Sequence, residues 1–466
     1  FDGTAWDDGS WRNTNAASQF GIWHGGGNRY IHTRPNTGGC AYTGTGGDTC
    51  LYLSTSNNPS TSLRAKYNET RWMRPDLKRE NLFVFVNSEL DSGIEAYTEI
   101  GYYHSFATQQ LFGGTTLGAG SCAKTGSCTQ PFLIPLSNYW LNQLVDSSGN
   151  KLVDSSQIKN GLGLWKSRHR FNAPRGYDSD RVTLRFLQGF RGTIGDWDWD
   201  TAVLWSDAKS KQKNKNRQSM TLLNQALALS TPNAYNPFCG GSGCSDESSF
   251  TINIFRENTT NLFLVDFKLS NNNVFEMPAG PVGALIGFES REEEYTDGRD
   301  PRIDGTIPYV VPTGPKAGLT FPLISDVVNS SATPASSGSR TTSSFFGELQ
   351  IPLLETVDAQ LAVRYEDSDD YGDATVGKFA VGWQPLDQVK LRYSASETFR
   401  APALILVNEG FLGRSTTTND ALLEYATGID YDTYSMQRVT EGNPGLKPEL
   451  GENESIGLVI EPLDNL

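Results

Sequence analysis

The sequence lacks any long hydrophobic run. Hydrophobic residues make up 37% of the 466 residues, but no stretch approaches the roughly 18 to 20 consecutive apolar residues that a transmembrane helix requires. We therefore expect no membrane-spanning helix. Residence in a membrane would then require β-strands, because their hydrophobicity is hidden in alternation with polar residues.

The sequence also lacks an excess of positive charge. Lys and Arg number 39 against 53 Asp and Glu, which gives a net charge of −14. Proteins that bind nucleic acid neutralise its phosphates with a basic surface. The basic residues gather only loosely, between residues 166 and 217, and acidic residues are interspersed there. This balance argues against a nucleic-acid partner and is typical of solvated loops.

Residues that bind metals are scarce. The four histidines are His24, His32, His104 and His169, and none lies near a pair of cysteines. The six cysteines form three close pairs without CxxC spacing: Cys40 with Cys50, Cys122 with Cys128, and Cys239 with Cys244. We predict three disulfide-closed loops, with zinc binding as the alternative. Disulfides indicate an oxidising compartment such as the periplasm or the cell surface. We expect no metal and no cofactor.

Glycine and aromatic residues are plentiful, and alternating segments accompany them. The clearest hairpin begins at Arg181 and turns at residues 192–195. Most alternate residues in its two halves are apolar, whereas most residues between them are polar or charged. The apolar positions include Val182, Leu184, Phe186, Phe190, Trp197, Trp199, Val203 and Trp205. Period-two alternation predicts β-strands with one apolar and one polar face.

The same hairpin plan recurs along the chain, for about eleven strands in all. Its other copies are 81–104, 262–288, 345–365 and 378–396, and no partner is evident for a last segment, 452–461. Short turns alternate strictly with long polar connections, such as 105–180, 208–258 and 296–340. This asymmetry predicts an all-β, antiparallel transmembrane β-barrel with short periplasmic turns and long extracellular loops. Aromatic strand ends and charges in mid-strand favour a barrel over a β-sandwich, which stays open as an alternative.

One long connection contains a helical pattern. Ser219 is a suitable N-cap, and apolar residues follow it at helical spacing up to Leu229. Such a helix needs an apolar surface beneath it. It forms either a lid packed on its own loop or part of a vestibule for a solute.

Five longer phrases carry more specific information. They are ALALSTPNAYNPFCGG (226–241), EMPAGPVGALIGFESREEEY (276–295), FFGELQIPLLETVDAQLAVRYEDSDDYG (345–372), FAVGWQPLDQVKLRYSASETFRAPAL (379–404) and GNPGLKPELGENESIGLVIEP (442–462). In order and in wording they resemble the barrel of the TonB-dependent outer-membrane receptor family. The prolines in these phrases have a structural role. We expect Pro402 to end a strand in a rigid bend, and Pro444 and Pro448 to keep the chain extended before the next strand.

The resemblance implies more than the residues alone show. Family members carry a TonB box and a plug ahead of a barrel of about 22 strands. We therefore expect residues 1–466 to be a partial barrel domain, without plug, TonB box or closing strands. The resemblance implies an outer-membrane receptor of a Gram-negative bacterium that imports a scarce solute with energy from TonB, and no enzymatic activity.

The expected partners follow from the same resemblance. They are TonB, reached through a missing N-terminal segment, the lipid of the outer membrane, and a small-molecule or oligosaccharide solute. Candidate solutes are a carbohydrate or other organic nutrient, an iron siderophore or cobalamin. The alternatives are a passive porin and a secreted β-sandwich that binds or cleaves carbohydrate.

Five loop aromatics are candidates for solute binding, because aromatic rings stack on sugars. They are Trp23, Tyr30, Trp72, Tyr139 and Trp140. Packing within the loops or at the membrane boundary is the alternative for each. The net charge of −14 favours a neutral polar solute over an anionic chelate, which it would repel at long range.

Two acidic clusters are weaker candidates. Residues 292–294 are consecutive glutamates, and consecutive positions of a strand alternate faces, so we expect a solvated strand end. Asp297, Asp300 and Asp304 could supply oxygen ligands to calcium, but their spacing differs from that of an EF-hand.

Overall fold

The computed structural model describes most of the chain in segments separated by gaps. The described residues are 19–24, 30–35, 38–44, 49–54, 70–115, 133–155, 158, 161–164, 169–239, 246–312, 317–418, 420–428 and 434–461. At residues 24, 30, 34, 35, 414–418 and 434–437 only the backbone is described.

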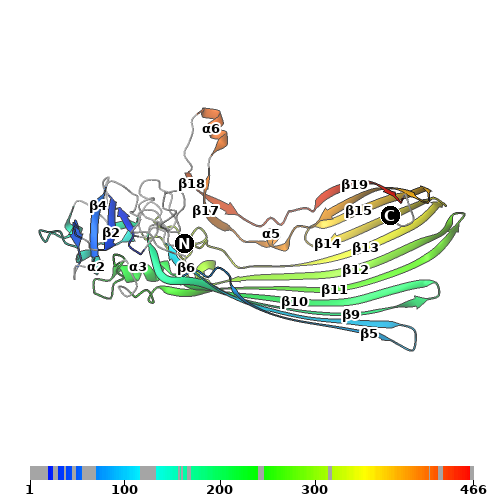
Figure 1. Cartoon of the computed structure of the whole chain (residues 1–466), viewed down its shortest axis with the longest axis horizontal. Helices are drawn as coiled ribbons and strands as arrows, with labels where there is room; N and C mark the ends of the chain where they lie inside the picture. Colours follow the sequence, from blue (N-terminus) through cyan, green and yellow to red (C-terminus); the bar gives the residue numbers. More distant parts are fainter. Residues whose placement is uncertain are drawn as a thin grey trace.

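One large antiparallel sheet of eleven strands dominates the molecule (Figure 1). Its strands are β5 (Asp76–Glu89), β6 (Glu95–Thr115), β9 (Arg170–Ile194), β10 (Trp197–Gln218), β11 (Thr251–Met277), β12 (Gly280–Arg299), β13 (Ser336–Leu354), β14 (Val357–Ser368), β15 (Gly372–Leu386), β16 (Val389–Arg400) and β19 (Glu449–Ile460). They pair in chain order, with β5 and β19 at the two edges. The predicted all-β antiparallel architecture is confirmed, and the long strands form one curved sheet rather than the two packed sheets of a sandwich.

Tight turns join the strands at one end of this sheet. They span residues 90–94, 195–196, 278–279, 355–356 and 387–388. Gly195 has φ 63° and Gly280 has φ 133°. Residues other than glycine rarely adopt these backbone conformations. The long connections lie at the opposite end, which we call the loop end.

The strands extend further toward the loop end than the alternation predicts. β9 begins at Arg170 instead of Arg181, and β6 continues to Thr115, because polar residues there join the ladder. The turn between β14 and β15 spans only residues 369–371, so the prediction of strict alternation between short and long connections is wrong there. The last segment does have a partner, since β19 pairs with β16 from Val389–Ile460 to Arg400–Glu449.

A second, smaller sheet lies at the loop end. It has the order β3-β4-β2-β1-β8-β7 and combines segments far apart in sequence. Its strands are β1 (Ile22–His24), β2 (Tyr30–Pro35), β3 (Tyr42–Thr43), β4 (Thr49–Ser54), β7 (Leu133–Ile134) and β8 (Leu162–Leu164). A separate hairpin, β17 (Leu412–Thr418) and β18 (Tyr434–Thr440), projects away from the large sheet.

The larger of the two clusters of buried apolar residues in the described chain belongs to the loop end, and we call it the loop core. It contains Trp23, Leu51, Leu152, Phe171, Leu223, Tyr235, Phe238 and Phe250 among others. The helices are short: α2 (Tyr139–Asn142), the 3-10 helix η3 (Leu152–Asp154), α3 (Met220–Ala228), α4 (Pro301–Asp304), α5 (Leu404–Asn408) and α6 (Ala421–Thr427). None of the described helices is long and apolar enough to cross a membrane.

Candidate functional site

The large sheet has two chemically different faces, because alternate side chains of each strand point to opposite sides. On one face, which we call the apolar face, aromatic and aliphatic residues meet across strands. Phe288 lies opposite Phe345, with ring centroids 5.0 Å apart, and Phe345 lies opposite Tyr365. Ile286 and Phe345 are each 57% exposed. Soluble proteins rarely expose a continuous apolar surface of this kind.

The opposite face, the polar face, carries charged side chains in mid-sheet. Nη2 of Arg364 lies 3.0 Å from Oε2 of Glu366 and 3.3 Å from Oε1 of Glu289. Glu366 is buried and also accepts hydrogen bonds from Oη of Tyr371 at 2.7 Å and Oγ of Ser344 at 3.0 Å. These side chains come from β12, β13, β14 and the turn after β14. Their contacts therefore connect neighbouring strands on the polar face.

Further pairs continue the polar face toward β6. Arg185 of β9 lies 2.5 Å from Glu99, and Arg191 lies 2.6 Å from Glu95. Tyr97 donates a hydrogen bond to Asp200 at 2.9 Å. Such ion pairs are worth little to stability when they are exposed. They do place charged and hydrogen-bonding side chains along this side of the sheet.

The loop core contains ionisable groups that the sequence did not single out. His169 is buried, and its Nε2 lies 2.9 Å from Oη of Tyr235. The carboxylate of Glu247 accepts from the backbone amides of Asn172 at 2.9 Å and Ala173 at 3.1 Å. Burial lowers the pKa of His169 to about 3. Burial also raises the pKa of Glu247, against the effect of its hydrogen bonds. No local pattern marks these residues, because they lie on segments that meet only in the fold.

The predicted solute-binding aromatics occupy different environments. Trp23 is fully buried in the loop core, where its Nε1 donates to Oγ1 of Thr33 at 2.8 Å, so its indole packs as a core residue. Trp140 packs against the same core and donates to the carbonyl of Ala234 at 2.8 Å. Tyr139 stands beside Trp140 in α2, and Trp72 is 43% exposed beside β6. The side chain of Tyr30 lies outside the described residues. Solute binding by these aromatics stays a prediction.

One of the three predicted disulfides lies within the described residues. Cys40 and Cys50 are bonded, with Cα atoms 5.4 Å apart, and the bond joins β4 to the residues before β3. Cys122, Cys128 and Cys244 lie outside the described residues, so the other two pairings stay predictions. Cys239 itself is described and half-buried.

Of the two acidic clusters, residues 292–294 alternate faces as expected: Glu292 and Glu294 are exposed, whereas Glu293 pairs with Arg291 and Arg340. The aspartates are engaged in protein contacts. Asp297 is paired with Arg256 at 2.9 Å and with Arg299, which neutralises the carboxylate without calcium. Asp300 caps α4, and Asp304 accepts from the amide of Thr306. Among the described residues, no group of three or more His, Cys, Asp or Glu side chains could hold a metal ion.

The predicted loop helix is confirmed as α3, with Ser219 as its N-cap accepting from the amide of Leu222 at 3.2 Å. Met220, Leu223 and Leu227 are fully buried. Asp326, from the connection after α4, accepts from Oγ of Ser219 at 2.6 Å. The helix therefore packs against residues of several connections and not only against its own loop. Its role as a lid or as part of a vestibule stays a prediction.

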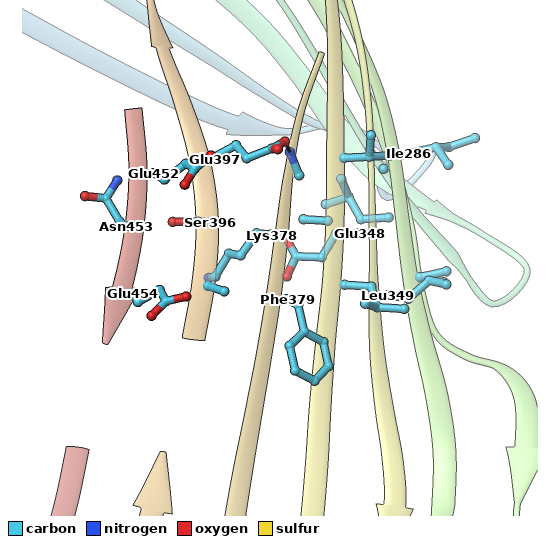
Figure 2. A pocket seen from close by; sticks show the side chains of 18 residues that line it. Ile286, Glu348, Leu349, Lys378, Phe379, Ser396, Glu397, Glu452, Asn453 and Glu454 are labelled. Carbon is cyan, nitrogen blue, oxygen red and sulfur yellow. Dashed lines mark hydrogen bonds between the residues drawn. The ribbon is translucent and has the colours of Figure 1, made fainter. Parts of the chain in front are cut away.

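A shallow hollow crosses the sheet from β12 to β19 (Figure 2). Ile286, Leu349 and Phe379 line it, together with Gly347 and Gly377. These residues belong to the apolar face. Three carboxylates line its end nearest β19: Glu397, Glu452 and Glu454. Ile286, Leu349 and Phe379 thus lie on the side opposite to the ion-paired cluster around Arg364. Glu348, Lys378 and Ser396 also line the hollow, although the strand register places them on the polar face.

Comparison with known proteins agrees with this architecture. Residues 123–466 match the family model described as TonB dependent receptor-like, beta-barrel. The fold is similar to that of the RagAB peptide transporter, at 12% identity and a TM-score of 0.41, covering 94% of this chain and 41% of that one. It is also similar to the ferric enterobactin receptor PfeA of Pseudomonas aeruginosa, in a doubly substituted form, at 13% identity and a TM-score of 0.38, covering 93% of this chain and 56% of that one.

A third similar structure is the siderophore receptor PirA of Acinetobacter baumannii, at 12% identity and a TM-score of 0.37, covering 93% of this chain and 55% of that one. The chain thus spans about half the length of these proteins. No curated protein sequence matches it. Because the family model covers most of the chain, the protein belongs to the TonB-dependent receptor β-barrel family, as the sequence phrases indicate.

Proposed function

We propose that this chain forms part of the wall of an active outer-membrane importer, and that its solute crosses on the polar face with energy supplied through TonB. The observation that carries the proposal is the division of one sheet into an exposed apolar face and an ion-paired polar face. A barrel wall needs this division, with lipid on one side and a wet interior on the other.

Closure of the barrel is the second part of the proposal. β5 and β19 are edge strands of the described sheet. Unpaired N–H and C=O groups cannot remain in hydrocarbon, so both edges pair with further strands of a barrel of about 22. A plug within the barrel and a TonB-binding segment, both outside residues 1–466, would make the transport active.

A neutral or weakly charged organic solute fits the chain best. The net charge of −14 repels anionic chelates at long range. The half-exposed aromatics Trp72 and Tyr139 at the loop end offer rings for stacking. A carbohydrate or another organic nutrient is therefore favoured over a ferric siderophore or cobalamin.

Uptake measurements test this function directly. The full-length natural protein is expressed in a Gram-negative host with intact or disrupted TonB. The labelled probes are a series of oligosaccharides, a peptide, a ferric siderophore and cobalamin. We expect saturable uptake of an oligosaccharide or other organic probe that is lost without TonB. Uptake that is unsaturable and independent of TonB would instead show a passive porin.

A further inference from the structure

Arg340 occupies a buried position at the loop end of β13. It is 6% exposed, and its Cζ lies 5.4 Å from the ring centroid of Tyr371. Nη1 donates to the carbonyl oxygen of Pro402 at 2.9 Å and lies 3.3 Å from Oδ2 of Asp370. Nη2 lies 3.1 Å from Oε2 of Glu293. One guanidinium therefore joins β12, β13, the turn after β14 and the segment after β16.

Pro402 belongs to the phrase FRAP, which the sequence singles out. It is the second residue of the long connection from β16 to β19. The other end of this connection lies at the same corner, because the amide of Asn443 donates to the carbonyl of Leu406 at 2.9 Å. Arg400 and Glu449 also lie opposite each other, at 3.6 Å, where β16 ends and β19 begins. The FRAP and NPGLKPE phrases thus meet at one place.

The helix after Pro402 fits closely against β13. A Cβ at Gly338 would lie 2.4 Å from Nδ2 of Asn408 in α5, so a larger residue here would require the Asn408 side chain to move. A Cβ at Gly410 would similarly lie 2.7 Å from Pro334. α5 is therefore held at the wall immediately beyond the bond from Arg340 to Pro402.

We propose that Arg340 is the centre of a rim clamp, formed with Glu293, Asp370 and the carbonyl of Pro402, which fixes both ends of the connection 401–448 on the sheet. The planar guanidinium serves three acceptors in different directions at once, which a lysine ammonium on a flexible stem cannot do with the same geometry. Since the connection leaves the sheet at the loop end, the clamp sets its position at the mouth. This holds whatever the solute and whether or not TonB is used.

Hydrogen exchange of the full-length receptor in outer-membrane vesicles tests the clamp. Arg340→Gln removes the charge and most donors, and Arg340→Lys keeps the charge alone. Arg185→Gln is the matched control, because Arg185 pairs only with Glu99 among the contacts of the described residues and lies on distant strands. We expect Arg340→Gln to raise exchange in 401–411 and 441–448 about tenfold or more, because it removes the charge-assisted hydrogen bonds that hold this corner. Arg340→Lys should give an intermediate rise, and Arg185→Gln none.

A second measurement separates the clamp from a general structural role. The temperature at which the barrel loses its compact gel mobility should be the same in Arg340→Gln and the wild type. If Arg340→Gln does not fold, Glu293→Gln with Asp370→Asn takes its place, with a smaller expected rise because the bond to Pro402 remains. Unchanged exchange in 401–411 in the folded variant, or an equal rise in Arg185→Gln, would overturn the proposal.

Discussion

Nε2 of His169 lies 2.9 Å from the hydroxyl oxygen of Tyr235, in the loop core. Burial lowers the pKa of His169 from 6.5 to about 3, so the folded protein keeps this ring neutral. The unfolded segment takes up a proton near pH 6.5, whereas the folded one does not. The contribution of His169 to stability is therefore complete above pH 6.5 and is lost as the pH falls from 6.5 toward 3, by about 1.4 kcal/mol per pH unit.

We expect the loop core to open in mild acid while the sheet remains folded. His169 faces the aromatic rings of Trp23, Phe171 and Tyr235, with Glu247 beyond Tyr235. A hydrogen bond with the backbone of Gln19 partly opposes the effect of burial on its pKa. The raised pKa of Glu247 acts in the opposite direction, because this carboxyl gains stability on protonation, and it offsets part of the loss. Hydrogen exchange of residues 169–173 between pH 8 and pH 4 measures the opening. His169→Gln should flatten the profile, and an unchanged profile in this variant would exclude His169 as its cause.

The bond between Cys40 and Cys50 should stabilise the small sheet independently of the large one. Closing a loop of this length contributes about 3 kcal/mol through the unfolded state. Cys50 is fully buried in β4, beside Leu51 of the loop core. Replacing both cysteines by serine should therefore raise proteolytic cleavage within residues 22–54. The heat stability of the large sheet is the internal control, and its loss in the same variant would mean that the two sheets unfold together.

Two glycines on neighbouring strands should respond differently to alanine. A Cβ at Gly287 would lie 2.2 Å from Cζ of Phe346, on the polar face, so the ring must move. A Cβ at Gly347, on the apolar face, meets its nearest atom at 3.5 Å. Gly287→Ala should lower the free energy of unfolding by about 1–3 kcal/mol, as overpacking does, whereas Gly347→Ala should be nearly neutral. Urea unfolding in vesicles measures both, and equal effects would contradict the packing described for Phe346.

The strands of the large sheet near the tight turns could be predicted because their signal is local. The alternation of apolar and polar residues in β10 and β14 is visible without knowing which strands pair. Ser219 likewise indicates the start of α3, because its side chain is a typical N-cap. The polar ends of β6 and β9 could not be predicted in this way. In residues 105–115 and 170–180 polar and small residues occur on both faces, so the period-two contrast that marks a two-faced strand fades.

The structure of the loop end could not be predicted, because it is formed by contacts between segments that are far apart in sequence. β1 pairs with β8, Trp23 opposite Leu164, across a long stretch of chain. The sequence makes Trp23 a candidate for solute stacking because it is an aromatic residue of a loop. Only the pairing of distant segments reveals that its side chain is buried in the loop core. The acceptor of Arg340 in the FRAP segment is a backbone carbonyl, which no side-chain motif reveals. By contrast, the close spacing of Cys40 and Cys50 made their bond predictable.

The central claim is that the apolar face of the sheet contacts lipid and the polar face lines the interior. Exposure alternates along β14, where Leu361, Val363 and Tyr365 are exposed and Ala362 and Arg364 are half-buried. A nitroxide scan of residues 357–366 in the full-length receptor, reconstituted in bilayers, measures contact with dissolved oxygen. The account predicts a period of two residues with maxima at 357, 359, 361, 363 and 365. Maxima at the even-numbered positions, or no alternation, would contradict it.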